Sequence, residues 1–270
     1  MRRAPSPPRV CTWGRERKPV QQRAATRRQM VAAPVIFAVA VLVLWQVTSL
    51  FVPSRVLPAP NDLAARLVLE LTDGGIAGYA FVTLSESFLG CLLGLLVALP
   101  LGYLVAHSAW ASRAIGPYLA ASQAIPAVAL APLIVIWFGY GQFPIALLCA
   151  LLVFFPIFVN TQLGLTTLDE DVIGAAQLDG AGRWRRLIWI EAPLALPALL
   201  AGIRNGFVLS VTGAVVGEFV MGGEGLGLLL SVYRDRSDTE GMFATLIVLA
   251  ACAVGIYLLM RALERRVRWW

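Results

Sequence analysis

Long apolar runs, several of them about 20 residues or longer, recur along this chain of 270 residues. A bilayer core about 30 Å thick is crossed by roughly 20 apolar residues in a helix. Only 14% of the residues are charged, against roughly a quarter in soluble domains, so a soluble fold of this length would lack the charges to cover its surface. Because lipid offers no partners to backbone N–H and C=O groups, the runs are predicted to be helices. The predicted fold class is an all-α polytopic membrane protein.

Six transmembrane helices are predicted, at about 31–52, 79–106, 117–138, 142–165, 188–219 and 242–263. Pro193 and Pro197 interrupt the start of the fifth, so its apolar part is expected to begin near Leu194. Only about Gly139 to Gln142 separates the third from the fourth, which predicts a tight helical hairpin. Together the spans form one transmembrane domain, 31–268, and no soluble segment is long enough to hold a core of its own.

Basic residues predict the orientation of the chain in the membrane. With the N-terminus placed in the cytoplasm, 17 of the 22 Lys and Arg residues fall inside and four fall outside. Because basic residues gather on the cytoplasmic side, this split predicts that both termini are cytoplasmic. The net charge of +6 thus has a membrane explanation, and no nucleic-acid partner is expected.

The first 30 residues are rich in Arg and Pro and have no apolar core. They are predicted to form a disordered cytoplasmic tail rather than a signal peptide. Met30 directly precedes the first span, so the true start stays open between Met1 and Met30. At the other end, Trp269 and Trp270 follow several arginines, which suits an anchor in the interfacial region of the membrane lipid.

Catalytic motifs are missing from the sequence. It contains no phosphate-binding loop of the Walker type, no paired-His protease motif and no Gly-x-Ser-x-Gly elbow. The single histidine, His107, has no obvious partner in the sequence and is interpreted as an interfacial residue, and the four cysteines are too scattered for a metal site. The chain is therefore not expected to be an enzyme or to bind a cofactor. Energy for uphill movement has to come from a coupling ion or from another subunit.

The loop predicted between the fourth and fifth spans, 169–187, is the most informative segment. Its acidic start at 169–171 suits a helix N-terminus, and Gly180 can adopt the positive φ of a sharp turn. This pattern predicts two short helices joined at Gly180. Ala175 and Ala176 are expected to leave a small-residue surface on which another protein can pack.

This loop resembles the EAA loop of the permeases of binding-protein-dependent ABC importers. That motif reads Glu-Ala-Ala, three residues, Gly, nine residues, Ile, any residue, Leu, Pro. Five residues match it without a gap, namely Ala175, Ala176, Gly180, Ile190 and Pro193, whereas Gly174 replaces the glutamate and Ala192 the leucine. The resemblance implies a coupling helix that docks on a cytoplasmic ATPase, which would bind ATP and Mg. The implied coupling residues are Gly174, Ala175, Ala176, Asp179, Gly180, Arg183, Ile190 and Pro193.

The resemblance covers about residues 56–268. Leu57-Pro58-Ala59-Pro60, Ile136-Trp137-Phe138-Gly139-Tyr140-Gly141 and Phe154-Phe155-Pro156 are similar to segments of the sulfonate, nitrate and taurine permeases, and Gly213 to Glu218 with Gly225-Leu226-Gly227 leans towards riboflavin and thiamine-precursor permeases. It implies the type I ABC importer permease fold in the bacterial plasma (inner) membrane, a second copy of the chain as partner, and a periplasmic or lipid-anchored binding protein. Homodimer and heterodimer both stay open.

Polar residues inside the predicted spans are candidates for lining a translocation path, since such residues usually face the protein interior or water. They are Glu86, Asn160, Thr161, Arg204 and Glu218. Three alternatives stay open: Glu86 and Arg204 form a structural ion pair, Glu218 is a helix-end carboxylate in interfacial water, and Asn160 and Thr161 bridge helices.

Glycines four residues apart allow helices to approach closely. The pair Gly90 and Gly94 is interpreted as packing within one subunit. For Gly213 and Gly217 a contribution to a dimer seam is kept as an alternative.

The predicted function is the permease subunit of an ATP-driven importer. Its substrate is expected to be a small organic molecule or oxyanion, with a slight preference for a vitamin or vitamin precursor over sulfonate, nitrate or taurine. The alternatives are a secondary transporter or channel without an ATPase, and a membrane scaffold or enzyme. A secondary transporter would predict an internal repeat, which the sequence lacks.

Overall fold

The chain forms helices and their connections in the computed structural model, which describes residues 27–72 and 74–267. The elements in chain order are α1 (Arg27–Ser49), α2 (Pro60–Thr72), α3 (Ile76–His107), α4 (Ala109–Ser122), the 3₁₀ turn η1 (Ala127–Leu130), α5 (Ala131–Phe138), α6 (Gln142–Thr166), α7 (Glu170–Leu178), α8 (Arg183–Arg186), the π-helical turn η2 (Leu187–Glu191), α9 (Ala192–Met221), α10 (Leu226–Asp235) and α11 (Thr239–Val267). The chain divides into two units, 1–45 and 46–270. The predicted tail, apart from its last four residues, and the terminal tryptophans lie outside the described residues.

Four helical segments in the described part of the chain are long and apolar enough to cross a membrane. They are Ile76–His107, Gln142–Thr166, Arg183–Met221 and Thr239–Arg266, and they match four of the predicted spans. A fifth candidate span results if α4, η1 and α5 are counted as one bent span. The apolar stretch Val35–Ser49 of α1 is shorter. The structure therefore gives four or five candidate spans in place of the six that were predicted.

The predicted third span, 117–138, is not one straight helix. Ala109–Ser122 and Ala127–Phe138 meet at an angle of 84° across a break of a few residues. Pro126, which lies in the break, has no N–H to donate and disfavours helical geometry at the residue before it. The connection that follows agrees with the prediction, because α5 ends at Phe138 and α6 begins at Gln142.

The predicted fifth span begins earlier than expected, since α8, η2 and α9 form one continuous helical segment from Arg183 to Met221. The prolines do not separate the span from the loop before it. Upstream of Pro193 the helix widens by one residue, and the Ala192 N–H donates to the Leu187 carbonyl. Such a π-helical turn gives room to a proline ring that would clash with the carbonyl four residues before it.

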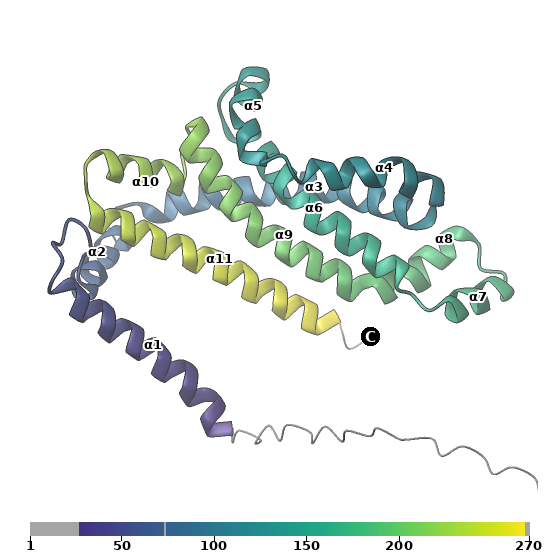
Figure 1. The fold of residues 1–270 in the computed structure, drawn as a ribbon, viewed down its shortest axis with the longest axis horizontal. Coiled ribbons are helices and arrows are strands. Elements are labelled where there is room, and N and C mark those ends of the chain that lie inside the picture. The colour runs from purple at the N-terminus through teal and green to yellow at the C-terminus, as the bar shows by residue number, and fades with distance from the viewer. Residues whose placement is uncertain (1–26, 73, 268–270) are drawn as a thin grey trace, which may run out of the picture. The chain divides into compact units, whose positions relative to one another are not determined.

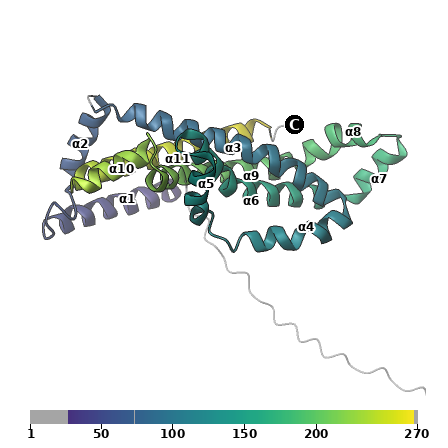
Figure 2. The same ribbon diagram turned by 90° about the horizontal axis from the view of Figure 1, so that it is seen from above.

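The helices α3, α6 and α9 run side by side and form the centre of the second unit (Figures 1 and 2). Gly90 of α3 lies so close to α6 that a Cβ there would be 2.7 Å from the Ala146 carbonyl oxygen. Gly213 of α9 lies equally close to Leu152 of α6, where a Cβ would be 2.7 Å from Cδ1. Packing within one subunit is thus confirmed for Gly90. The alternative that Gly213 contributes to a dimer seam is wrong, because α6 of the same chain covers its surface.

Two short helices that the sequence reading did not predict, α2 and α10, are held together by a polar cluster. Tyr233 of α10 donates to the Glu70 carboxylate of α2, and Arg66 lies 3.0 Å from Glu70 and 2.9 Å from Asp238. Burial, followed by the hydrogen bond to Glu70, raises the pKa of Tyr233. The phenol therefore stays a neutral donor to the buried carboxylate.

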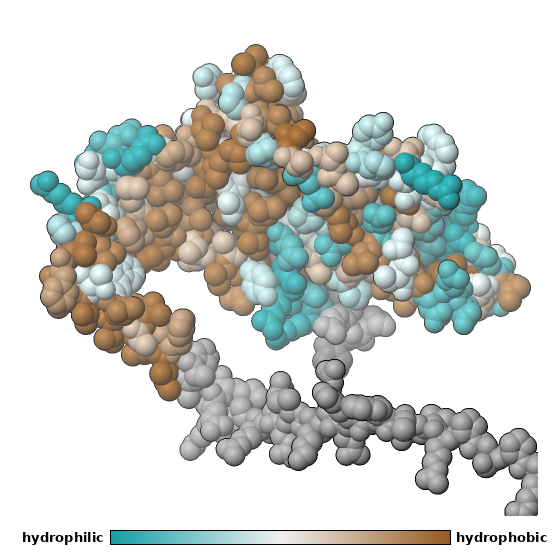
Figure 3. All heavy atoms as spheres, viewed as in Figure 1, coloured by the Kyte–Doolittle hydropathy of each residue, from teal (hydrophilic) through white to brown (hydrophobic). Residues whose placement is uncertain are grey.

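The surface of the second unit has the pattern of a membrane protein. In the view of Figure 3, hydrophobic residues cover the middle of α9, α10 and α11, and hydrophilic residues gather around α7 and α8, at the last turns of α11 and at the far end of α10. Many large apolar side chains are exposed there, among them Ile136, Phe219 and Leu258. In water such a surface would drive aggregation, whereas lipid tails match it.

Candidate functional site

The segment that contains the EAA-like residues folds as two helices joined at a glycine, as predicted. At the start of α7 the Asp169 side chain accepts from the Asp171 N–H at 2.9 Å, which caps the helix. At its end Gly180 has φ 77°, and the Ala181 N–H donates to the Ala176 carbonyl at 3.0 Å. This is the Schellman arrangement, in which glycine adopts the left-handed conformation without a steric penalty.

Most of the predicted coupling residues lie on the surface of this segment. Five of them are exposed, namely Ala175, Asp179, Gly180, Arg183 and Pro193, and two are half-buried, namely Gly174 and Ile190. Ala176, in contrast, is buried within its own chain. The expected small-residue surface is therefore wrong for Ala176 and is provided by Ala175 alone.

Large apolar side chains at the same end were not singled out from the sequence. Leu178, the last residue of α7, is 90% exposed, and Trp184 of α8 is 77% exposed. Both lie within a few residues of charged side chains, Asp179 and Arg183, away from the apolar middle of the molecule. Exposed apolar groups with a polar rim are typical of surfaces that bind another protein.

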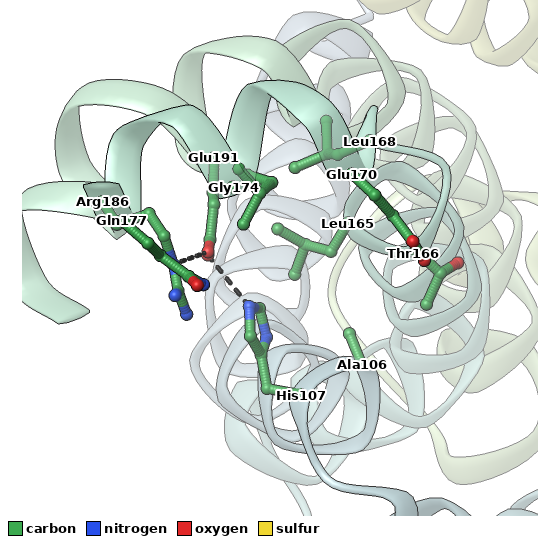
Figure 4. Close-up of a pocket in the computed structure, with 11 residues that line it drawn as sticks. Ala106, His107, Leu165, Thr166, Leu168, Glu170, Gly174, Gln177, Arg186 and Glu191 are labelled. Carbon is green, nitrogen blue, oxygen red and sulfur yellow. Dashed lines mark hydrogen bonds and ion pairs between the residues drawn. The ribbon is translucent and has the colours of Figure 1, made fainter. Parts of the chain in front are cut away.

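A polar pocket of about 460 Å³ lies between the C-terminal end of α3 and the segment α7–η2 (Figure 4). Its central group is the carboxylate of Glu191, whose residue is only 2% exposed. Arg186 Nε lies 2.6 Å from Glu191 Oε1, and His107 Nε2 lies 3.0 Å from Glu191 Oε2. The last residue of α3 thus lies next to a buried carboxylate at the start of the fifth span.

His107 has partners on both ring nitrogens, which corrects the interpretation of an interfacial residue without a partner. Nδ1 lies 3.1 Å from the Tyr103 carbonyl oxygen, and Nε2 faces Glu191. His107 and Glu191 are 84 residues apart in the sequence, and no local pattern links them. The sequence therefore did not indicate the triad of His107, Arg186 and Glu191.

A second polar region lies at the opposite end of α9, where Glu218 and Glu86 are each 1% exposed. Glu218 Oε2 accepts from the Gly227 N–H, and Thr83 Oγ1 accepts from the Leu226 N–H at 2.8 Å. Both bonds satisfy free N–H groups in the first turn of α10. The alternative of a Glu218 carboxylate in interfacial water is therefore wrong, because this carboxylate is buried against the start of α10.

Arg204 lies elsewhere and does not pair with Glu86. Its Nη1 is 2.6 Å from Oε2 of Glu264 in α11, and its guanidinium carbon is 5.3 Å from the ring centre of Tyr257. The alternative of a Glu86–Arg204 ion pair is thus wrong. The sequence could not indicate Glu264, since it lies in the last turns of α11, 60 residues away from Arg204.

Asn160 and Thr161 direct their donors into their own helix. Asn160 Nδ2 donates to the Pro156 carbonyl at 2.8 Å, and Thr161 Oγ1 donates to the Ile157 carbonyl at 2.7 Å. Thr161 is buried and lies against Gly102 of α3. The printed hydrogen bonds of both side chains thus stay within α6 and do not bridge it to another helix. A role in a translocation path stays a prediction.

Comparison with known proteins places the chain in a family. Residues 90–269 match the model of the binding-protein-dependent transport system inner membrane component. The riboflavin transport system permease protein RibX of Chloroflexus aurantiacus is 45% identical over 231 residues, which are 84% of this chain and 86% of RibX. The formylaminopyrimidine transport permease protein ThiX of Halalkalibacterium halodurans is 29% identical and covers 90% of this chain and 98% of its own length. The taurine permease TauC of Escherichia coli is 30% identical, with 90% of each chain covered.

Solved structures share the fold at low identity. An inward-facing structure of the MetNI methionine ABC transporter superposes with a TM-score of 0.66 at 19% identity and covers 73% of this chain and 98% of its own. An amino acid ABC transporter solved with histidines gives a TM-score of 0.59 at 19% identity, with 74% and 97% covered. The chain belongs to the binding-protein-dependent ABC transporter permeases: it is the multi-pass transport subunit of an importer whose ATPase is a separate protein and which works with a substrate-binding protein.

Proposed function

We propose that two copies of this chain enclose one translocation path and that each copy docks its 169–187 segment on a cytoplasmic ATPase subunit. The observation that carries the proposal is the exposed end of this segment, with Ala175, Leu178 and Trp184 on its surface. ATP and Mg are bound by the ATPase, not by this chain. Movement of the docked segment changes which side of the membrane the path opens to.

The continuous helix from Arg183 to Met221 supports coupling through this segment. No loop lies between α8 and the span, so a displacement of α8 moves α9 directly. The His107–Arg186–Glu191 triad ties the same point to α3. A secondary transporter or channel, the alternative raised from the sequence, offers no role for this segment, and membership of the importer family excludes it.

A topology with six spans and both termini in the cytoplasm completes the proposal. The sixth span is α1, whose 23 residues correspond to about 34 Å of helix, enough for the hydrocarbon core. The domain boundaries are those expected from the sequence, a basic tail over 1–30 and a transmembrane domain over 31–268. The predicted excess of basic residues on the inner side supports this orientation.

For the path we propose Glu86 and Glu218 at the outer end and Arg204 at the inner end, with Asn160 and Thr161 lower in rank because they bond within α6. For the substrate we propose a vitamin or vitamin precursor. This preference is supported by the relatives RibX and ThiX, whose names give riboflavin and formylaminopyrimidine as what they transport. TauC, whose name gives taurine, is less similar than RibX.

Co-purification from the native host in a gentle detergent tests the docking. We expect the tagged chain to bring down a Walker-motif ATPase in equal amounts and a binding protein in the presence of substrate. Gly180→Pro should abolish recovery of the ATPase, because proline fixes φ near −65° where Gly180 needs 77°. Recovery of an intact, monodisperse permease without any ATPase would contradict the proposal.

Gly182→Pro is the matched control for this experiment. It places the same residue two positions further along the same loop, where φ is already −65° and matches the value of proline. ATPase recovery should therefore stay at the wild-type level. Equal loss in both variants would mean that the effect comes from proline in the loop and not from the left-handed turn at Gly180.

A further inference from the structure

A cluster of arginines lies where α9 meets the C-terminal end of α11, apart from the coupling segment. It surrounds a cavity of about 270 Å³, which is lined by Arg204 of α9 and by Arg261, Glu264 and Arg265 of α11. We call it the arginine pocket. The three residues of α11 are three or four positions apart and therefore share one face of the helix. Three guanidinium groups and one carboxylate give the lining two positive charges in excess.

The carboxylate of the pocket is already engaged. Glu264 Oε2 lies 2.6 Å from Nη1 of Arg204, and the two side chains are only 16% and 21% exposed. Arg204 Nε is buried and has no hydrogen-bond partner among the described residues. A guanidinium carries only donors and stays charged, so a shared proton cannot account for this lone N–H. Because a buried donor without an acceptor is costly, it points to an acceptor supplied from outside the chain.

The two other arginines of the pocket repel each other. Arg261 and Arg265 are exposed, and neither forms an ion pair with a described residue. They stand one helical turn apart, a spacing at which like charges destabilise a helix. An anion between them removes this repulsion and accepts charge-assisted hydrogen bonds, which arginine forms well with phosphate.

Apolar side chains continue the same face of α11 away from the arginines. Val254 and Leu258 precede Arg261 by seven and three residues, which places them in one stripe with Arg261 and Arg265. They are 55% and 54% exposed. Figure 3 shows the matching change from hydrophobic to hydrophilic residues along α11.

The arginine end of α11 reaches the depth of lipid headgroups. The segment Thr239–Arg266 is apolar and long enough to cross a membrane, and its 28 residues correspond to roughly 42 Å of helix. This exceeds the hydrocarbon core of about 30 Å, so the last turns lie among the headgroups. An apolar stripe that ends in a basic pocket at this depth fits a phospholipid, whereas a free anion would make no use of the stripe.

We propose that the arginine pocket binds the phosphate of an anionic phospholipid, such as phosphatidylglycerol, with an acyl chain along Val254 and Leu258. Basic pockets between membrane helices are sites at which anionic headgroups bind. The phosphate gives Arg204 Nε its acceptor, and the lipid joins α9 to the end of α11. The inference goes beyond the proposed function and does not depend on it. It competes with the proposed path only for Arg204.

Native mass spectrometry of the full-length chain, purified in detergent and stripped of lipid, tests this proposal, because it resolves the first bound lipid from later ones. The probes are dioleoyl-phosphatidylglycerol, the zwitterionic dioleoyl-phosphatidylcholine and inorganic phosphate. We expect the first phosphatidylglycerol to bind at least about tenfold more tightly than phosphatidylcholine, since its net negative charge is attracted by the arginines. Excess inorganic phosphate should not displace it, because phosphate lacks the acyl chains.

Two variants locate the site, and a third is their control. Arg261→Gln combined with Arg265→Gln should weaken the first phosphatidylglycerol about thirtyfold. Arg204→Lys keeps the charge next to Glu264 but removes the unpartnered Nε–H, and should weaken it severalfold. Arg55→Gln combined with Arg236→Gln removes two exposed arginines outside the pocket and should leave the affinity unchanged.

Folding of the variants is checked by their Tm in detergent without lipid, which should stay at the wild-type value for the exposed pair Arg261 and Arg265. Equal affinity for the two lipids, displacement of phosphatidylglycerol by inorganic phosphate, or equal losses in the pocket variant and the control would each overturn the inference. Wild-type affinity in Arg204→Lys would remove Arg204 from the lipid site and return it to the path.

Discussion

Replacing Arg186 by methionine is expected to destabilise the region where α3 meets η2, because it leaves the carboxylate of Glu191 buried with one partner fewer. Breaking a buried ion pair typically costs about 3–5 kcal/mol. The Arg186 side chain is 17% exposed and His107 stays 3.0 Å from the carboxylate, so a lower value of about 2–3 kcal/mol applies. At roughly 2–4 °C per kcal/mol for a chain of this size, the expected fall in Tm is about 4–12 °C.

Thermal unfolding in nanodiscs, followed by intrinsic fluorescence, measures this loss. The double variant Arg186→Met with Glu191→Met removes both partners, and it should regain more than half of the lost stability because no buried charge is left unpaired. Arg185→Met is the control, since Arg185 is exposed and forms no ion pair with a described residue. Losses that simply add in the double variant, or an equal fall in Tm for Arg185→Met, would refute the reasoning.

Three further outcomes are expected in the same assay. Gly90→Leu should lower the free energy of unfolding by at least about 2 kcal/mol, because the new side chain would meet the carbonyl of α6. Gly78→Leu is the control, because a side chain there meets open space, and it should cause no such loss. Similar losses in both variants would argue against close packing at Gly90. Tyr233→Phe should cost about 1–3 kcal/mol by removing the hydrogen bond to Glu70, and an unchanged Tm would show that this bond adds nothing. Gly174→Glu, which restores the glutamate of the family motif where a side chain meets open space, should change stability by less than about 0.5 kcal/mol, and a loss of folded protein would contradict that.

The four straight spans were predictable because each is a long apolar run, and the length of a run is a strong signal. α2 and α10 were missed for the same reason, since 13 and 10 residues are too few for a span and their apolar faces appear only in helical projection. The break at Pro126 was also missed, because a proline inside a membrane helix is often accommodated without a sharp bend. The local shape of the coupling segment was predictable from Gly180 and the acids at 169–171, whose chemistry acts within one helical turn.

Partners of the polar residues could not be predicted from the sequence. Glu86 and Arg204 were paired as a hypothesis on charge alone, yet they belong to opposite ends of the molecule, Glu86 next to Glu218 and Arg204 next to Glu264. Opposite charges in two spans say nothing about the depth of each in the membrane. The same holds for His107 and Glu191, which meet only because the C-terminal ends of α3 and η2 come together.

The unbroken segment from Arg183 to Met221 has a mechanical consequence. Its 39 residues correspond to a rod of roughly 58 Å, longer than the hydrocarbon core it crosses. For a rod of this length a tilt of about 5° at one end swings the other by roughly 5 Å. A small rotation at the α8 end of this segment is thus magnified at its other end, where Glu218 accepts a hydrogen bond from the first turn of α10.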